Sequence, residues 1–542
     1  MKNKIIFLLA FLTSLGVKAG ITDMVVTSTN LPLIIINAGE DIPDGIKITA
    51  TMKIIYNGAG HSNHPSDPGN AYNGYVGIEI RGSYSASLPQ KPYGFETRDA
   101  SGKSINVPLL DMPADNDWIL IANYNDKTFM RNTLAFNLFG WMGHYQPRTK
   151  LCEVILNNEY QGIYVLTEKI KRGKNRVDIA KLDLDDNAGD SLTGGYIIKI
   201  DNSNGSDGWQ STFDAIDRPG GYPYFIYTYP KPDVITEPQK TYIQGFINSL
   251  ETELRTATFN DPVTGYPAYF NTYSFIDYFI ISEISRNVDA YKKSAYFFKD
   301  KNSNGGLLNA GPVWDFDWAW KNINECEVDA PDGSGWTYEI SSVCQSYPVP
   351  PGWMVKLLDD TTFDNKLNTR YFNLRKNLLS TKNLLRYIDS IHTLVDTAQL
   401  RHYTKWPILG INVGAPEIPG EPQPTTYAGE IAKFKDWVLT RISWLDENMP
   451  GRYIENINSE FASEKVKYRL FPNPAHDILV FESEKKIQQI EIFNSVGSRM
   501  TIKKSGNSYS YKIDVRNFLP GLYITKATLE GNKFIMSKFI VE

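Results

Sequence analysis

Two aspartates stand one residue apart in the sequence GPVWDFDWAWKN, which spans residues 311 to 322. Asp315 and Asp317 lie there among three tryptophans and a phenylalanine. An unpaired carboxylate is costly to bury, so these acids either face water or hold a positive charge. A further acid, Asp289 in the sequence RNVDAYKK, precedes them in the chain. The segment between Asp289 and Asp315 decides whether the acids share one site.

That segment is typical of a β-hairpin. Two short apolar strands flank the sequence NSNGG at residues 302–306, whose residue types favour a tight turn. The midpoint between Asp289 and Asp315 is position 302, which falls inside this turn. Since neighbouring antiparallel strands lie ~4.8 Å apart, a roughly symmetric hairpin brings the two acids together at its open end.

Two carboxylates this close repel each other unless one is protonated or a cation lies between them. A divalent metal with phosphate is one solution, because Mg²⁺ is typically held by one or two carboxylates and by substrate phosphates. The layout resembles the active-site stretch of protein kinases, where a catalytic-loop Asp precedes a short hairpin that leads to a metal-binding Asp. The signatures HRD, GxGxxG and DFG are missing, so the motifs exclude the ordinary kinase family but keep its geometry.

The elements that must position these acids predict an α+β protein. Residues 20 to about 180 carry alternating strand patterns with one interrupting helix, and predict a β-rich N-terminal lobe. Residues 240–450 carry helical periodicity and predict a helical C-terminal lobe. Residues 451–467 are interpreted as a linker. Residues 468–542 show short strands with turns about every 10 residues, which is typical of a small all-β sandwich.

The N-terminus indicates export. Residues 1–19, in MKNKIIFLLAFLTSLGVKAG, combine a basic start, a short apolar run and a small-residue cleavage site, so they predict a secretory signal peptide. A membrane helix would need ~20 apolar residues, and no other run reaches that length. We therefore expect an exported protein without a transmembrane segment. Export makes a disulfide possible, and we pair Cys326 with Cys344 in a Gly/Pro/Ser-rich loop, leaving Cys152 buried in an apolar strand.

The charge balance excludes some partners. The chain has 56 Lys and Arg against 61 Asp and Glu, a net charge of -5 and a pI of about 5.8. A nucleic-acid-binding surface would show as a basic patch or a high pI, so no nucleic-acid partner is expected. The sequence has no CxxC motif or Cys/His cluster, which argues against zinc.

A more specific resemblance rests on seven stretches that run in order from about residue 30 to 450: LPLIIINAGEDIPDGIKITATM, IEIRGSYSASLPQKPYGFETRD, MPADNDWILIANYNDKTFMRN, LNNEYQGIYVLTEKIKRGKNRVDI, LTGGYIIKID, ISRNVDAYKKSAYFFKD and GPVWDFDWAW. On these residues the chain resembles the CotH family, the spore-coat-type atypical protein kinases, in its secreted Bacteroidetes form. The resemblance implies a two-lobed atypical kinase domain over residues 20–450. It also implies transfer of the γ-phosphoryl group of ATP, with Mg²⁺ or Mn²⁺, to a protein hydroxyl.

The same resemblance assigns roles to the acids. Asp289 matches the family's catalytic-loop acid, which would position the acceptor hydroxyl or bind metal. Asn287, two residues earlier, could orient Asp289. Asp315 matches the metal-binding acid. Asp317 falls where related sequences often carry Asn, so it is either a second metal ligand or only a support.

The β-rich lobe supplies the expected cofactor-binding residues. Arg81 matches the family's RG-x-S motif, and Arg81 and Lys91 are candidates for contacts with the phosphates of ATP. Glu168, at the end of the strand IYVLTEKI, could pair with Lys91, as a Lys–Glu pair does in kinases.

The C-terminal segment carries a second resemblance. FPNP, IEIFNSVG and NFLPGLYITKATLEG look like the C-terminal sorting domain of the type IX secretion system. This implies that the secretion machinery is a partner. It also implies that the protein passes the inner membrane and is then secreted or attached to the cell surface.

Plain alternatives stand beside these assignments. Asp289 could cap a helix, Asp315 and Asp317 could cap a strand end, and the other assigned residues could be surface charges. The tryptophans could form core, or one could face an adenine ring. Residues 300–305 partly match a calcium loop, but position twelve is Gly311 rather than Glu, which favours the hairpin turn. Because ATP is scarce outside cells, the alternative function is a non-catalytic surface adhesin or binding module on a kinase-like scaffold.

Overall fold

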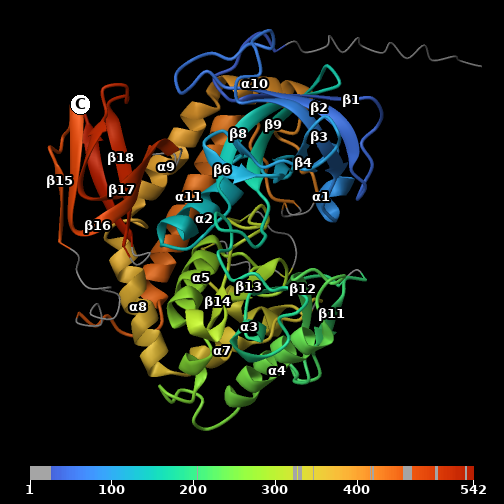
Figure 1. The fold of residues 1–542 in the computed structure, drawn as a ribbon, viewed down its shortest axis with the longest axis vertical. Coiled ribbons are helices and arrows are strands. Elements are labelled where there is room, and N and C mark those ends of the chain that lie inside the picture. Colours follow the sequence, from blue (N-terminus) through green and yellow to red (C-terminus); the bar gives the residue numbers. More distant parts are fainter. Residues whose placement is uncertain are drawn as a thin grey trace, which may run out of the picture.

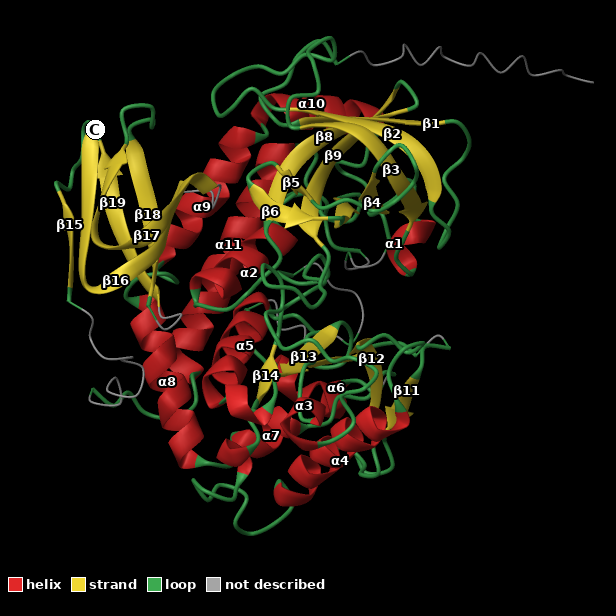
Figure 2. Cartoon of the chain, in the orientation of Figure 1, coloured by secondary structure: helices red, strands yellow, loops and turns green. Residues whose placement is uncertain are grey.

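The computed structural model of the protein shows a mixed α+β chain with a β-rich N-terminal region, helices mainly in the C-terminal half and an all-β region at the end (Figures 1 and 2). The predicted signal peptide lies outside the described residues, and so does most of the predicted linker. The structure describes residues 26–203, 205–321, 326, 332–345, 347–414, 417, 420–455, 467–494, 499–530 and 534–542.

The N-terminal region is a closed seven-stranded barrel in the order β1-β2-β3-β4-β7-β9-β8. It closes where β1 pairs with β8 in parallel. β-Branched and aromatic residues fill its interior, among them Ile54, Val76 and Trp118, each at most 1% exposed. The strands are β1 Leu33–Ala38, β2 Ile48–Ile55, β3 Tyr72–Ile80, β4 Tyr93–Arg98, β7 Asp117–Ala122, β8 Thr149–Leu156 and β9 Glu159–Glu168.

Shorter elements connect the strands of the barrel. Helix α1, Tyr84–Ser87, links β3 to β4, and β5, Val107–Leu109, pairs with β6, Met112–Asp115. Helix α2, Arg131–Trp141, is the predicted interrupting helix. The carboxylate of Asp126 accepts a hydrogen bond from the Arg131 backbone N–H at 2.9 Å, so this acid holds the turn that enters the helix.

The second region combines helices with a five-stranded sheet, of which the sequence predicted only the hairpin within a mostly helical lobe. The sheet order is β11-β12-β10-β13-β14. The predicted hairpin is confirmed: Phe297 pairs with Ala310 and Lys299 with Leu308, around the 3₁₀ turn Asn302–Asn304. The strands are β10 Tyr196–Ile200, β11 Gly208–Gln210, β12 Tyr224–Tyr229, β13 Ala295–Lys299 and β14 Leu308–Ala310.

The helices surround this sheet and connect it to the barrel. Helix α5 is buried from Ser274 to Ser285 and forms the centre of the region. Helix α10 reaches the barrel, where His402 Nδ1 accepts a hydrogen bond from the Ile163 N–H at 3.1 Å. The helices are α3 Gly189–Leu192, α4 Glu237–Glu253, α5 Thr272–Ser285, α6 Ile340–Val343, α7 Trp353–Leu357, α8 Thr361–Arg375, α9 Thr381–Leu394, α10 Asp396–Lys405 and α11 Tyr427–Asn448, with 3₁₀ turns at Tyr266–Ala268 and Thr337–Glu339.

The C-terminal region is all-β, as predicted, and lies beside the C-terminal helices (Figure 1). All five strands join one sheet through the long strand β16, which pairs with β15, β17 and β18. The strands are β15 Tyr468–Phe471, β16 Ile478–Asn494, β17 Arg499–Asp514, β18 Gly521–Leu529 and β19 Phe534–Val541.

Two further expectations concern cysteines and membranes. The predicted disulfide between Cys326 and Cys344 is present, and Cys152 is a buried free thiol. Within the described ranges, no helix is both long and apolar enough to span a membrane.

Candidate active site

The second sheet brings three chain segments to one edge. Asp201 directly follows β10, and Ser294 directly precedes β13. Because Ile200 pairs with Ala295, Asp201 and Ser294 lie side by side. Ser294 Oγ donates a hydrogen bond to Asp315 Oδ2 at 2.6 Å and lies 3.5 Å from Asp201 Oδ2. The hydroxyl of Ser294 therefore connects two carboxylates.

Asp315 lies in an electrostatically unfavourable place for a carboxylate. Its side chain reaches solvent, but protein atoms surround it on most sides. This desolvation, together with the negative charges of Asp317 and Asp201, raises the pKa of Asp315 above its ordinary value. Desolvation also raises the pKa of Asp317, whose Oδ2 accepts a hydrogen bond from Asn125 Nδ2 at 2.8 Å. A cation placed among these oxygens would relieve the repulsion.

The backbone at this site is held in unusual conformations. Arg286, Ser294 and Asp315 have φ values of 47°, 48° and 58°, in the left-handed region that non-glycine residues rarely adopt. Such a conformation costs ~1–3 kcal/mol and persists only where the surrounding structure imposes it. Arg286 ends α5, Ser294 directly precedes β13 and Asp315 follows β14, so the outliers lie on the loops that carry the acids, as is typical of functional sites.

Asp289 reaches the site from the end of α5. The helix stops at Ser285, and the loop that follows is tied down by Asn287. Asn287 Oδ1 accepts the Asp289 N–H at 3.1 Å, while Asn287 Nδ2 donates to the Asp315 carbonyl at 3.2 Å. The orienting contact expected of Asn287 is thus present. It joins Asp289 to Asp315 through the backbone, and the carboxylate that shares Ser294 with Asp315 is Asp201.

The carboxylate of Asp289 faces two lysines. Lys292 Nζ and Lys293 Nζ lie 3.4 and 3.3 Å from Asp289 Oδ1. Asp289 is 8% exposed, and its Oδ1 accepts no hydrogen bond from any residue that the structure describes. Its carboxylate is therefore paired with two cations, and its Oδ1 can still accept a hydrogen bond, as from the hydroxyl of an acceptor.

A cavity of about 320 Å³ lies beside the acids, between the barrel and the second sheet. Its volume is within the usual range for small-molecule sites. Arg81, Lys169 and Lys199 give it positive charge, and Trp314 and Tyr296 give it aromatic surface. The remaining lining residues are Ile119, Ile170, Ser206, Asp207, Ile226, Tyr227, Thr228 and Pro232.

One ion pair links the cavity to the acids, and Trp314, which directly precedes Asp315, lies in the cavity wall. Lys199 Nζ lies 2.6 Å from Asp201 Oδ2, and the Arg81 guanidinium lies 5.9 Å from the centroid of the Trp314 ring. Arg81 therefore lines this cavity, and its contact with phosphate stays a prediction. Four residues near the cavity were not among those predicted from the sequence: Lys169, Lys199, Asp201 and Ser294.

Two predicted cofactor residues have other partners. Lys91 Nζ donates to the Ala86 carbonyl at 2.9 Å. Glu168 is fully buried and pairs with Arg148 Nη1 at 2.6 Å and with Arg176. The expected pair between Lys91 and Glu168 is therefore not formed, and Glu168 is not a surface acid. The next residue, Lys169, lines the cavity, because neighbouring residues of an extended chain point to opposite sides.

The residues fit a metal that shares its ligands with phosphate. Across the described part of the chain, no group of three or more His, Cys, Asp or Glu side chains is placed to hold a metal ion. Asp315 and Asp201, joined by Ser294, offer two carboxylates and one hydroxyl. Mg²⁺ is typically held by one or two carboxylates, with water and substrate phosphates as its other ligands.

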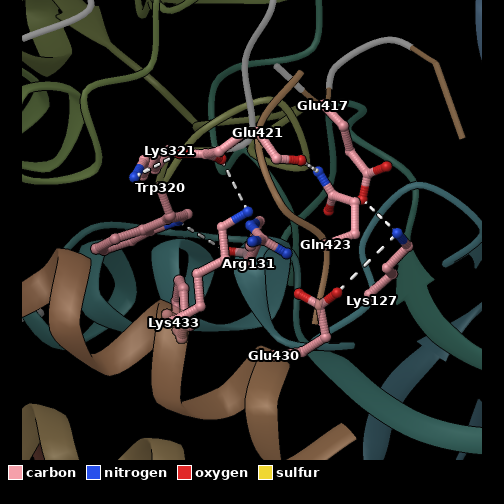
Figure 3. Close-up of a pocket in the computed structure, with 10 residues that line it drawn as sticks. Lys127, Arg131, Trp320, Lys321, Glu417, Glu421, Gln423, Glu430 and Lys433 are labelled. Carbon is pink, nitrogen blue, oxygen red and sulfur yellow. Dashed lines mark hydrogen bonds and ion pairs between the residues drawn. The ribbon is translucent and has the colours of Figure 1, made fainter. Parts of the chain in front are cut away.

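A second, polar pocket is lined by Trp320 and Lys321, which follow the acids in the chain (Figure 3). Lys127 Nζ contacts Glu417 Oε1 at 2.6 Å, and Lys321 Nζ contacts Glu421 Oε1 at 2.8 Å. Trp320 Nε1 donates to the Arg131 carbonyl at 3.2 Å. These charges neutralise one another, so we assign this pocket to holding the loop after Asp317 against α2 and α11.

Comparison with known families identifies the chain. The family model described as "CotH kinase protein" matches residues 78–445, and the one described as "Secretion system C-terminal sorting domain" matches residues 469–542. The first match covers more than half of the chain, so the protein belongs to the CotH family. The second indicates export by type IX secretion to the cell surface or medium, and a Bacteroidetes origin. A search of curated proteins finds no match.

Proposed function

We propose that this protein is an exported CotH-type atypical kinase that transfers the γ-phosphoryl group of ATP to a protein hydroxyl with Mg²⁺ or Mn²⁺. The barrel and the second region act as the two lobes. The proposal is supported above all by one arrangement: Ser294 joins the carboxylates of Asp201 and Asp315 beside a cavity that carries three cations.

Different residues of the chain are assigned to metal binding and to phosphate binding. Asp315, Asp201 and Ser294 would hold the metal, which supplies neutralisation of the phosphate charge when bound. Arg81, Lys169 and Lys199 bind phosphate oxygens, as guanidinium and ammonium groups do. Phosphate binding by Lys91 is proposed only as a secondary role, since its Nζ donates to the Ala86 carbonyl and it is not among the residues that line the cavity.

Asp289 positions the acceptor and takes its proton. The acceptor oxygen forms a bond to the γ-phosphorus while the bond from that phosphorus to the bridging oxygen breaks, and ADP leaves. The proton of the acceptor hydroxyl passes to the Asp289 carboxylate. The spacing supports this assignment: kinase catalytic loops place a metal-binding Asn five residues after the catalytic Asp, and Ser294 stands five residues after Asp289.

A non-catalytic surface adhesin or binding module is the second candidate. Ser294 offers a single hydroxyl where kinases have an amide. Two lysines also pair with the Asp289 carboxylate, where the acceptor hydroxyl would have to approach. Both features favour a scaffold that binds nucleotide or protein with weak transfer.

The test is transfer of γ-labelled phosphate. The purified mature protein, incubated with labelled ATP and Mg²⁺ or Mn²⁺, should label itself or an added protein acceptor. Asp289→Asn should lower the rate by ~100-fold or more, since general acid–base groups contribute about that much. Asp315→Asn removes a proposed metal ligand and should lower the rate by a similar factor. Asp183→Asn, on an exposed loop, is the matched control and should retain the rate. Absence of nucleotide binding at millimolar ATP would exclude the kinase, and binding without transfer would support the second candidate.

A further inference from the structure

We propose that the Cys326–Cys344 disulfide positions the Asp289 loop, so that phosphate transfer requires oxidation of these two thiols. The inference rests on the proposed function for its effect on activity. Its effect on the conformation of the loop can be measured independently.

The disulfide packs directly beneath the catalytic loop. Val288, between Asn287 and Asp289, is 1% exposed. It forms a small apolar cluster with Ile340, and the partly buried Cys326 and Cys344 pack against that cluster. This cluster is separate from the large core of the region. The disulfide therefore contributes to the apolar packing around Val288.

Lys292 connects the disulfide to the catalytic carboxylate. Its side chain is 1% exposed, and its Nζ lies 3.5 Å from Cys326 Sγ and 3.4 Å from Asp289 Oδ1. A buried ammonium group keeps its place only while its partners surround it. If Cys326 moved, Lys292 would lose one of these partners, and the charge facing Asp289 would move with it.

Residues 333–334, which precede Cys344 in the chain, are tied to the same loop by hydrogen bonds. Arg286 Nη1 donates to the Ser334 carbonyl at 2.9 Å. Arg441 on α11 donates to the Gly333 carbonyl at 2.7 Å and to the Glu283 carbonyl, at the end of α5, at 2.7 Å. The loop from Arg286 to Ser294 lies outside regular helices and strands. Its geometry thus depends on this neighbouring segment, and the disulfide locks that segment in position.

The redox step follows ordinary thiol chemistry. One cysteine thiolate attacks the disulfide of a thiol–disulfide carrier and releases one carrier thiolate, and the second cysteine then displaces the remaining carrier sulfur. The two thiols lose two electrons and two protons, and the carrier leaves as a dithiol. Cytosolic thiols stay reduced. The kinase would therefore stay inactive in the cytoplasm, where ATP is abundant, and become competent only after export.

The activity test compares oxidised protein, protein reduced with dithiothreitol, and the double variant Cys326→Ser/Cys344→Ser. Reduction should lower the transfer rate at least tenfold. The double variant should show the same low rate and no further response to the reductant. Because the disulfide does not line the nucleotide cavity, kcat should fall while the KM for ATP stays within about twofold. Full activity after complete reduction, verified by mass, would overturn the proposal.

Hydrogen–deuterium exchange provides the readout that does not need activity. Peptides covering residues 286–294 should exchange at least tenfold faster after reduction, while peptides from β8 in the barrel keep their rate. If the double variant does not fold, reduction of the folded wild-type protein provides the same comparison. Faster exchange in a protein that never transfers phosphate would support the positioning role and refute the proposed function. Unchanged exchange in the loop would refute the positioning role.

Discussion

Asp315 and Asp317 are separated by one residue, yet they have different partners. Asp315 bonds to Ser294 in the second region, whereas Asp317 accepts a hydrogen bond from Asn125, on the loop that leads from the barrel to α2. Asp317 thus ties the two regions together beside the site. Its assignment as a metal ligand stays a prediction, and the structure gives a reason to rank it below Asp315.

The difference between the two acids can be measured. Asp317→Asn keeps an oxygen that can accept the Asn125 hydrogen bond, so it should lower phosphate transfer by less than tenfold. Asp315→Asn removes a proposed metal ligand and should lower transfer by ~100-fold or more. The transfer rate of each variant, measured as Mn²⁺ is titrated at saturating ATP, distinguishes the two substitutions. Equal losses in the two variants would contradict this ranking.

A second prediction at the residue scale concerns the role of Asp201 in the proposed metal site. It lies beside Ser294 and pairs with Lys199 in the cavity wall. Asp201→Asn removes one negative charge from the proposed metal site, so the Mg²⁺ concentration for half-maximal transfer should rise about tenfold, in line with the affinity lost when groups around a metal change. Asp185→Asn, an exposed acid outside the site, is the control. An unchanged Mg²⁺ requirement would exclude Asp201 from the metal site.

At the scale of elements, local signals were predictable and long-range pairings were not. The turn sequence at 302–306 was enough to predict the β13–β14 hairpin, because both strands are close in the chain. Nothing local indicates that β10 pairs with β13, so Asp201, which is 93 residues from Ser294, was missed. Closure of the barrel by parallel β1 and β8 is a long-range pairing of the same kind. The alternation of a strand shows its faces, but not which strand lies next to it.

Helix α8 carries a testable pH dependence. Burial and the nearby charges of Asp360 and Asp359 raise the pKa of Asp364 to about 7, against ~3.9 in an unfolded chain. Between these two values the folded state keeps a proton that the unfolded state releases. Stability from this group is therefore lost as the pH rises from about 4 to about 7. Asp364→Asn should remove that loss.

The expected gain in stability for Asp364→Asn depends on the exposure of Asp364. Water reaches part of its side chain and screens the charges, so we expect a gain of about 1 kcal/mol at pH 8 for Asp364→Asn, well below the full value of the shift. Near pH 4 the variant and the wild-type protein should have the same stability. Urea unfolding at several pH values tests this. A constant difference between the two proteins across the pH range would contradict it.

At the scale of the whole molecule, the candidate site needs both the barrel and the second region. Arg81 and Lys169 come from the barrel side, whereas Lys199, Tyr296 and Trp314 come from the second region. The sequence was sufficient to place a β-rich region before a helical one. It was not sufficient to show which residues meet across the boundary, because that depends on packing between distant segments. Lys91 illustrates this: Arg81 lines the cavity, whereas the Lys91 side chain, ten residues later, bonds to the Ala86 carbonyl in α1.

The tail is a separate sheet whose role concerns delivery. Its core is formed by its own residues, among them Phe481, Ile490 and Phe539. It approaches the barrel through charges, since Glu491 on β16 pairs with Arg499 at 3.0 Å and interacts with Arg148 beside β8. No tail residue is among those that line the cavity. Export and catalysis should therefore be separable.

Deletion of residues 468–542 tests that separation. The truncated protein keeps its signal peptide, so it should cross the inner membrane and accumulate in the periplasm instead of reaching the cell surface, which fractionation and surface labelling would detect. Purified from the periplasm, it should transfer phosphate at the rate of the full chain, because the acids and the cations of the cavity are all retained. Normal surface delivery without the tail would refute its sorting role. Retention in the periplasm with loss of transfer would show instead that the tail supports the active site.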